Sequence, residues 1–188
     1  MNNNKKIFWT EALKGGTVVG LVSVAFSIVM QMSGEVTTLV KLLNVMSTVV
    51  TVLLLFGFTR RFAAQSNPSE GFSMGKAVGF VVAMMAISGV LAGIYTAVMA
   101  NFFIHDELMV VVDEMMAGMQ DTIPADSFEQ YYNLMRTMLT NPFMLTLSSV
   151  LSNVLLGLLC GVCVGFWTRR QPDIFAPAEE QQDNLKQE

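Results

Sequence analysis

The residues of this chain whose types suggest chemistry gather in one acidic, methionine-rich stretch, HDELMVVVDEMMAGMQD (residues 105–121). The stretch contains four methionines and the only histidine of the chain. Copper accepts thioether and imidazole ligands, so His105, Met109 and Met116 are weak candidates for a metal site. A calorimetric titration with copper that produced no heat would remove this hypothesis.

As an α-helix, the same stretch is amphipathic. At about 100° per residue its apolar side chains share one face, which holds Leu108, Met109, Val111, Val112, Met115, Met116 and Met119. The carboxylates of Asp106, Asp113 and Glu114 fall on the opposite face. Sulfur and carboxylate groups therefore point apart, and methionine also fills irregular apolar gaps well. We expect a surface helix with no metal and no cofactor.

A second amphipathic segment follows Pro124. Asp126 can cap its first turn, with Glu129 three residues later as in a capping box. Its apolar stripe includes Tyr131 and Tyr132, and tyrosines suit a membrane–water interface. The sequence predicts two short helices that lie over the outer ends of a helical bundle. Their candidate interaction surface consists of Asp106, Asp113, Glu114, Tyr131 and Tyr132.

Most of the remaining chain is apolar enough to lie in a membrane. Charged residues make up only 14% of the sequence, against roughly 25% in soluble domains. Apolar runs cover residues 13–32, 36–59, 77–100 and 143–168, and a helix needs about 20 residues to cross a bilayer. The sequence therefore predicts an all-α integral membrane domain (1–170), a four-transmembrane-helix bundle. The two amphipathic helices (about 105–140) connect its third and fourth spans, and a polar, disordered tail follows (171–188).

Charge predicts the topology of these spans. Of the eleven basic residues, all but Lys41 and Arg136 lie on one side of the predicted membrane. By the positive-inside rule that side is cytoplasmic, so both termini are cytoplasmic and the amphipathic segment lies on the outer side of the membrane. A cleaved signal peptide is the alternative for the first run, which is longer than the roughly 7–15-residue core of such peptides. No basic patch indicates nucleic-acid binding.

Small residues recur every four positions within the spans. They include Gly75, Gly79, Gly89 and Gly93 around the third span, and Gly157, Gly161 and Gly165 in the fourth. This spacing lets helix backbones approach closely in lipid, either inside one chain or in a homo-oligomer. The endings GFTRR (57–61) and GFWTRR (165–170) also leave two interpretations open. They indicate either a duplicated hairpin or two unrelated basic stop signals.

The sequence shows no catalytic motif. It has no nucleophile–base pair, no zinc spacing and no Gly-rich phosphate loop, so we expect no enzymatic activity. Cys160 and Cys163 lie in an apolar span with no neighbour that would activate a thiol, and we expect them to be buried small residues. Polar runs at 44–51 and 148–153 are the remaining feature of the spans.

Several segments together resemble a known family. The order of the four spans, the segments GFSMGKAVGF (71–80) and ISGVLAGIYTAVMANFFIHDELM (87–109), and the closing basic pair carry the likeness. They resemble an uncharacterised bacterial membrane family, domain of unknown function 4199, over residues 7–170. The resemblance implies four spans with an amphipathic external connection between the last two. It implies no catalytic or binding residue.

These observations favour a non-enzymatic membrane protein, such as an accessory subunit or an envelope scaffold. Its expected partners are membrane lipid and either another membrane protein or a second copy of the chain. The alternative is a small oligomeric transporter or channel, with a pathway lined by the Asn, Ser and Thr residues of the two polar runs.

Overall fold

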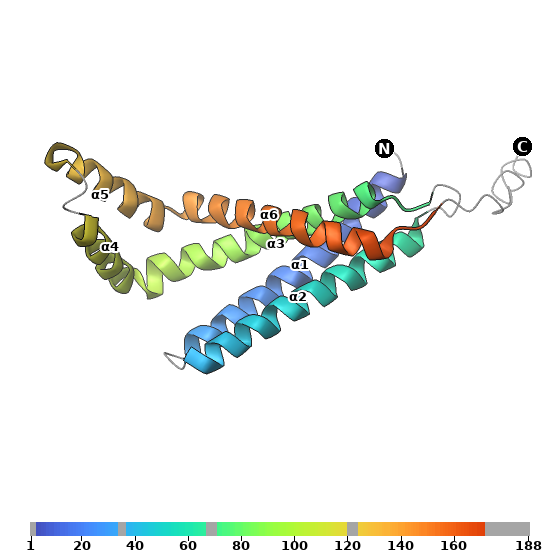
Figure 1. The fold of residues 1–188 in the computed structure, drawn as a ribbon, viewed down its shortest axis with the longest axis horizontal. Coiled ribbons are helices and arrows are strands. Elements are labelled where there is room, and N and C mark those ends of the chain that lie inside the picture. The colour runs from blue at the N-terminus through green and yellow to red at the C-terminus, as the bar shows by residue number, and fades with distance from the viewer. Residues whose placement is uncertain (1–2, 34–36, 67–70, 120–123, 172–188) are drawn as a thin grey trace, which may run out of the picture.

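The computed structural model describes residues 3–33, 37–66, 71–119 and 124–171. Within these ranges the chain is almost wholly helical (Figure 1). In chain order its elements are α1 (Asn3–Met32), α2 (Thr37–Gln65), α3 (Met74–Val98), a π-helical turn η2 (Met99–Phe103), α4 (His105–Met119), α5 (Ala125–Thr140) and α6 (Pro142–Thr168).

Four helices are long and apolar enough to cross a membrane: α1, α2, α3 continued by η2, and α6. Their mean hydropathies are 1.8, 2.2, 2.3 and 2.1. The all-helical fold and the four long apolar helices predicted from the sequence are confirmed, and they are consistent with a multi-pass membrane protein.

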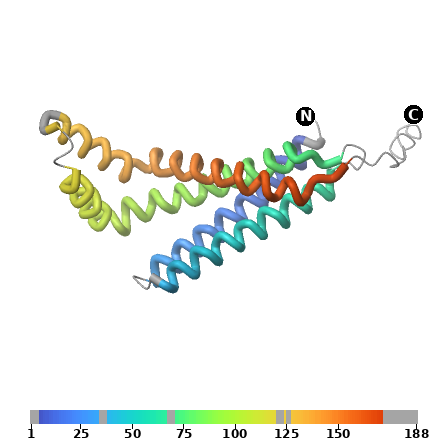
Figure 2. The backbone as a smooth tube through the Cα atoms, viewed as in Figure 1, coloured from blue at the N-terminus to red at the C-terminus, as the bar shows by residue number. Residues whose placement is uncertain are grey.

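The long helices form two hairpins, α1–α2 and α3–α6, that meet at one end and diverge at the other (Figures 1 and 2). We call the meeting end the basic end, because it carries Lys5, Lys14, Arg60, Arg61, Lys76, Arg169 and Arg170. Towards the opposite, open end the two hairpins diverge, although the Tyr95 hydroxyl of α3 still donates a hydrogen bond to Gln31 of α1 at 3.3 Å. As a result, 44% of the apolar stretch of α3 is buried, compared with only 6% of that of α2.

Glycines set how closely α3 and α6 approach each other. A β-carbon added at Gly93 would lie 2.7 Å from the Cα of Thr146, and one at Gly89 would lie 2.8 Å from the Cα of Val150. On α6, β-carbons at Gly157, Gly161 and Gly165 would lie 2.9, 3.2 and 3.2 Å from Met85, Val78 and Met74 of α3. These five glycines therefore serve contacts within the chain, where close backbone approach drives helix association in lipid.

An aromatic cluster closes the basic end. The rings of Phe62 and Phe80 stack with their centroids 4.4 Å apart, and Phe8 meets both edge-on. Phe72, 1% exposed, packs against Phe62. Phe72 also exchanges two backbone hydrogen bonds with Arg170, so the start of α3 and the end of α6 are tied together beside the cluster.

The structure differs from the sequence-based expectation in three places. Helix α1 begins at Asn3 and so extends well before the predicted span (13–32). Its first turns are helical because they pack on the aromatic cluster through Ile7 and Phe8. Helix α5 begins at Ala125 with Pro124 at its N-cap, so Asp126 lies inside the helix rather than at its cap. The predicted disordered tail is not one of these differences, because the described residues end at residue 171 and the tail lies outside them.

The third difference concerns α4 and α5, which do not lie over the ends of all four long helices. They extend beyond α3 and α6 and away from the α1–α2 hairpin (Figure 1). The connections explain this placement. Only Ile104 separates η2 from α4, and only Asn141 separates α5 from α6. Such short links keep both helices at the end of their own hairpin.

Candidate functional site

A side-chain hydrogen bond joins the two short helices that carry the predicted interaction surface. The Tyr132 hydroxyl of α5 donates to the Asp113 carboxylate of α4 at 2.9 Å. This hydrogen bond, helped by the negative charge of Asp113, raises the pKa of Tyr132 above its ordinary value. Asp113 is thus engaged within the chain. Asp106, Glu114 and Tyr131 are exposed and form the outward part of the predicted surface.

Methionines of α4 and α5 line a cavity of about 200 Å³ between the two helices. Its walls are Met116, Met119, Tyr131, Leu134, Met135 and Met138. Met116 is 2% exposed, so the methionine face of α4 packs against α5. His105 is the first residue of α4 and lies about 16 Å along the helix from Met116, too far for one ion to contact both. In the described part of the chain, no group of three or more His, Cys, Asp or Glu could hold a metal.

Helix α2 carries polar side chains towards the open end. Asn44, Thr48 and Thr51 recur at intervals of four and three residues and continue in register with Leu55 and Phe62, so all five share one helix face. Leu55 and Phe62 are buried in the core at the basic end. Asn44 and Thr48 are exposed, because the hairpins have diverged at their level. We call Asn44, Thr48 and Thr51 the polar face of α2.

The polar side chains of the α1–α2 hairpin differ in whether they have hydrogen-bond partners. The hydroxyls of Ser27 and Thr48 donate to carbonyl oxygens one turn earlier in their own helices. Gln31 of α1 accepts a hydrogen bond from Tyr95 of α3 at 3.3 Å. For the side-chain amide of Asn44, the described residues provide no partner. An amide left in hydrocarbon without a partner is costly, so the exposed Asn44 amide needs an explanation.

The polar run of α6 does not meet the polar face of α2. Asn153 donates to the backbone oxygen of Ser149 at 2.9 Å, and both residues lie against Gly89 of α3. The first halves of α2 and α6 belong to different arms of the molecule (Figure 1). One chain therefore does not build a pathway lined by both runs.

A buried carboxylate at the basic end was not predicted from the sequence. Glu11 of α1 is 7% exposed. One carboxylate oxygen lies 3.0 Å from the Lys14 ammonium and the other lies 4.0 Å from Nε of Arg61 on α2. The pair of contacts links α1 to α2 by charge. The available signal was a single acidic residue among the lysines that precede the first apolar run.

The two cysteines of α6 are both free. Cys160 is partly buried, as expected of a small residue near the core, whereas Cys163 is exposed. The expectation that both are buried is therefore wrong for Cys163. The α3-facing positions of α6 are occupied by Gly157, Gly161 and Gly165 instead, which turns Cys163 outward.

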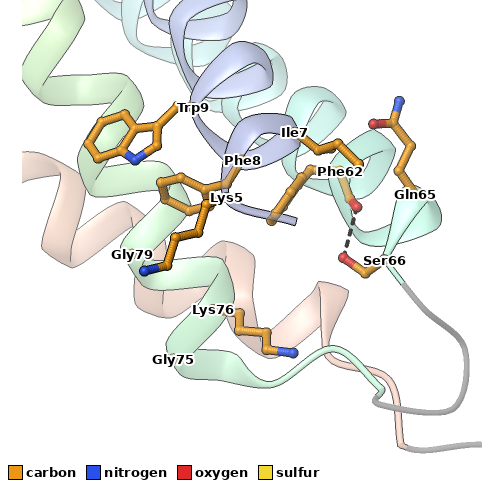
Figure 3. A pocket seen from close by; sticks show the side chains of 10 residues that line it. All are labelled: Lys5, Ile7, Phe8, Trp9, Phe62, Gln65, Ser66, Gly75, Lys76 and Gly79. Atoms are coloured by element: carbon orange, nitrogen blue, oxygen red, sulfur yellow. Dashed lines mark hydrogen bonds between the residues drawn. The ribbon is translucent and has the colours of Figure 1, made fainter. Parts of the chain in front are cut away.

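A pocket of about 520 Å³ at the basic end was also missed (Figure 3). It lies between the start of α1, the end of α2 and the start of α3. Its lining consists of Lys5, Ile7, Phe8, Trp9, Phe62, Gln65, Ser66, Gly75, Lys76 and Gly79. None of these described residues is acidic. The residues come from three distant segments, so no local pattern in the sequence could indicate the pocket.

Residues 14–170 match a family described as "Protein of unknown function (DUF4199)". No curated protein and no solved structure matches the chain.

Proposed function

We propose that this chain, which belongs to the DUF4199 family, is a non-enzymatic integral membrane protein that binds a transmembrane helix of another membrane protein. The partner helix would lie against the polar face of α2, where the two hairpins diverge. In this role the protein is an accessory subunit or scaffold, with its basic end and both termini in the cytoplasm of a bacterial inner membrane.

The single observation that supports this proposal is the change of environment along one face of α2. At the basic end the face is covered by α1 and α3, and Leu55 is 0% exposed. At the open end the same face is uncovered at Asn44 and Thr48. One end of this helix face is packed against protein, and the other end exposes polar side chains. This difference favours a protein neighbour for the exposed, polar end.

Lipid is a poor occupant for this surface. Acyl chains offer no hydrogen bond to the Asn44 amide, whereas a polar side chain on a neighbouring helix does, and such a bond contributes roughly 0.6–2 kcal/mol. Gly89 and Gly93 of α3 and the three glycines of α6 are already used in contacts within the chain. The polar face of α2 is therefore the better candidate for an intermolecular helix contact.

Site-specific photo-crosslinking in native membranes tests the proposal. A photoreactive benzoylphenylalanine at Thr48 should give an adduct whose second peptide comes from a membrane span of another protein. The matched control is Val49, which is 52% exposed and points about 100° away around the helix. Replacement Asn44→Leu should reduce the Thr48 adduct and leave any Val49 product unchanged.

Equal adduct yields at Thr48 and Val49 would contradict the proposal. An adduct that joins two copies of the chain would make the partner a homo-oligomer instead.

The transport alternative has a separate observation in its favour, because the same polar face could line a pathway between several chains. Flux through proteoliposomes that contain only the purified protein distinguishes it. Solute or ion flux that Asn44→Leu abolishes would support transport, and absence of flux would count against it.

A further inference from the structure

We propose that the cavity between α4 and α5 binds one soft monovalent metal ion of the Cu⁺ type through four methionine sulfurs. The ligands are Met116, Met119, Met135 and Met138. This site differs from the candidate set in the sequence, whose members all lie on α4. It is also independent of the helix partner proposed for α2. The inference rests on the spacing of the four methionines, the cavity that they share and the access to it.

The four methionines form two pairs, one on each helix. Met116 and Met119 are three residues apart on α4, and Met135 and Met138 are three residues apart on α5. Side chains at this interval are neighbours on one helix face, with β-carbons about 5–6 Å apart. All four side chains line the same cavity. The helix pair therefore brings four thioethers to one place, two from each side.

Thioether sulfur is a soft and uncharged ligand. It suits Cu⁺, whereas Mg²⁺ and Ca²⁺ take oxygen ligands and Zn²⁺ takes thiolate, imidazole or carboxylate ligands. Methionine is unbranched and has three rotatable bonds, so its sulfur can turn towards an ion while the helices keep their places. The cavity, of about 200 Å³, leaves space for the ion and for this rotation.

Apolar packing alone explains this wall less well. Only Tyr131 and Leu134 complete the described lining, so methionine supplies four of its six residues. The whole chain has 15 methionines among 188 residues, and the wall is therefore strongly enriched in sulfur. Methionine that serves packing fills irregular gaps, but here the four side chains surround an open space. The enrichment and the open space together favour a ligand.

The cavity has both a buried wall and an accessible one. Met116 is 2% exposed, whereas Met119 and Met138 are 37% and 52% exposed, so an ion can enter past the second pair of side chains. The outward face of α4 carries the exposed carboxylates of Asp106 and Glu114. These charges raise the local concentration of cations, and the thioethers then select the soft ones.

Titration with Ag⁺ tests the site, because Ag⁺ shares the charge and the ligand preference of Cu⁺ and keeps its oxidation state in buffer. The full chain is used in detergent and chloride-free buffer, with Cys160→Ala and Cys163→Ala so that neither free thiol competes for the ion. Methionines labelled with ¹³C at the methyl group report on their sulfurs by NMR. One equivalent of Ag⁺ should shift four of the 15 methyl signals, and Ca²⁺ should shift none.

Leucine variants remove single sulfurs and keep the apolar packing, since leucine and methionine have similar volumes. Met116→Leu and Met135→Leu should each weaken Ag⁺ binding at least about tenfold in a calorimetric titration, the loss that changes beyond the direct ligands already cause at metal sites. The matched control is Met115→Leu on the same helix, because Met115 is 47% exposed and does not line the cavity. Its affinity for Ag⁺ should equal that of the cysteine-free chain.

Three results would overturn the proposal. Methyl signals that stay in place at one equivalent of Ag⁺ would show that these sulfurs hold no ion. An equal loss of affinity in Met115→Leu and Met116→Leu would show loose binding by surface methionines. Unchanged affinity in a variant with both Met116→Leu and Met135→Leu would place the ion elsewhere. The NMR titration needs no substitution in the cavity, so it decides the question even where a leucine variant fails to fold.

Discussion

The hydroxyl of Tyr132 lies 2.9 Å from the carboxylate of Asp113 and donates a hydrogen bond to it. The two residues lie on different short helices, nineteen positions apart in the chain. Below them the methionine face of α4 packs against α5 around Met116. The polar contact at the surface and the apolar contact beneath it therefore fix the angle between α4 and α5.

Removal of this hydrogen bond should loosen the helix pair without unfolding the chain. In Tyr132→Phe the apolar contact around Met116 remains, so the melting temperature should change little, while the distance distribution between α4 and α5 should broaden. Spin labels at Ala117 and Asn133, both exposed, report that distribution in a variant without native cysteines. An unchanged distribution would show that the methionine contact alone holds the pair.

The same pair should respond to alkaline pH. Because the pKa of Tyr132 is raised by its hydrogen bond and by the charge of Asp113, the folded pair retains the phenol proton more strongly than the separated helices do. Its contribution is complete below the ordinary pKa of 10.0 and is lost as pH rises through the higher folded value. The spin-label distribution should therefore broaden above about pH 10, and in Tyr132→Phe this pH effect should disappear.

The helix elements could be predicted from the sequence because their signals are local. Four apolar runs of membrane length correspond to α1, α2, α3 and α6, and the stretch that begins at His105 is an amphipathic helix, α4. The spacing of Gly89 and Gly93 with the three glycines of α6 also indicated close helix packing. These features depend on residue type and interval alone.

The arrangement of the hairpins could not be predicted, because it depends on which faces meet. Asn44 and Leu55 lie on one face of α2, yet one is exposed and the other buried. Only the divergence of the two hairpins separates their environments. Likewise, Gly79 lies four residues after Gly75, the same interval that separates Gly89 from Gly93, but Gly79 faces a pocket. Periodicity reports that a glycine can be approached closely and does not report what approaches it.

Gly93 and Gly57 provide a matched test of the α3–α6 contact. Alanine at Gly93 places a β-carbon 2.7 Å from backbone atoms of Thr146, which cannot rotate away, so Gly93→Ala should destabilise the fold by roughly 1–3 kcal/mol. Gly57→Ala meets open space and should be neutral or stabilising by up to about 1 kcal/mol, since alanine favours helix. Thermal unfolding in mild detergent measures both. Equal shifts in the two variants would contradict the packing role of Gly93.

The loss of stability caused by replacing Lys14 should depend on whether the buried carboxylate of Glu11 is present. Lys14→Ala leaves Glu11 buried with only the more distant Arg61, and should destabilise the chain by roughly 0.5–2 kcal/mol, a range discounted because the lysine is exposed. In a Glu11→Gln background the buried charge is absent, so the same change should have almost no effect. A double-mutant cycle of unfolding free energies measures the coupling. Additive effects would mean that the ion pair contributes nothing.

The proposed orientation predicts opposite labelling of the two ends. Lys41 and Arg136 are the only basic residues assigned to the open end, and the remaining nine of eleven lie at the basic end or in the following tail, which the positive-inside rule places in the cytoplasm. In a variant without native cysteines, Glu114→Cys should react with a membrane-impermeant maleimide in intact cells, because Glu114 is exposed on α4. Lys6→Cys at the basic end should react only after the cells are permeabilised. The reverse pattern would place Lys5 and the rest of the basic end on the outer face, contrary to the positive-inside rule. Labelling of both positions in intact cells would mean that the chain inserts in two orientations.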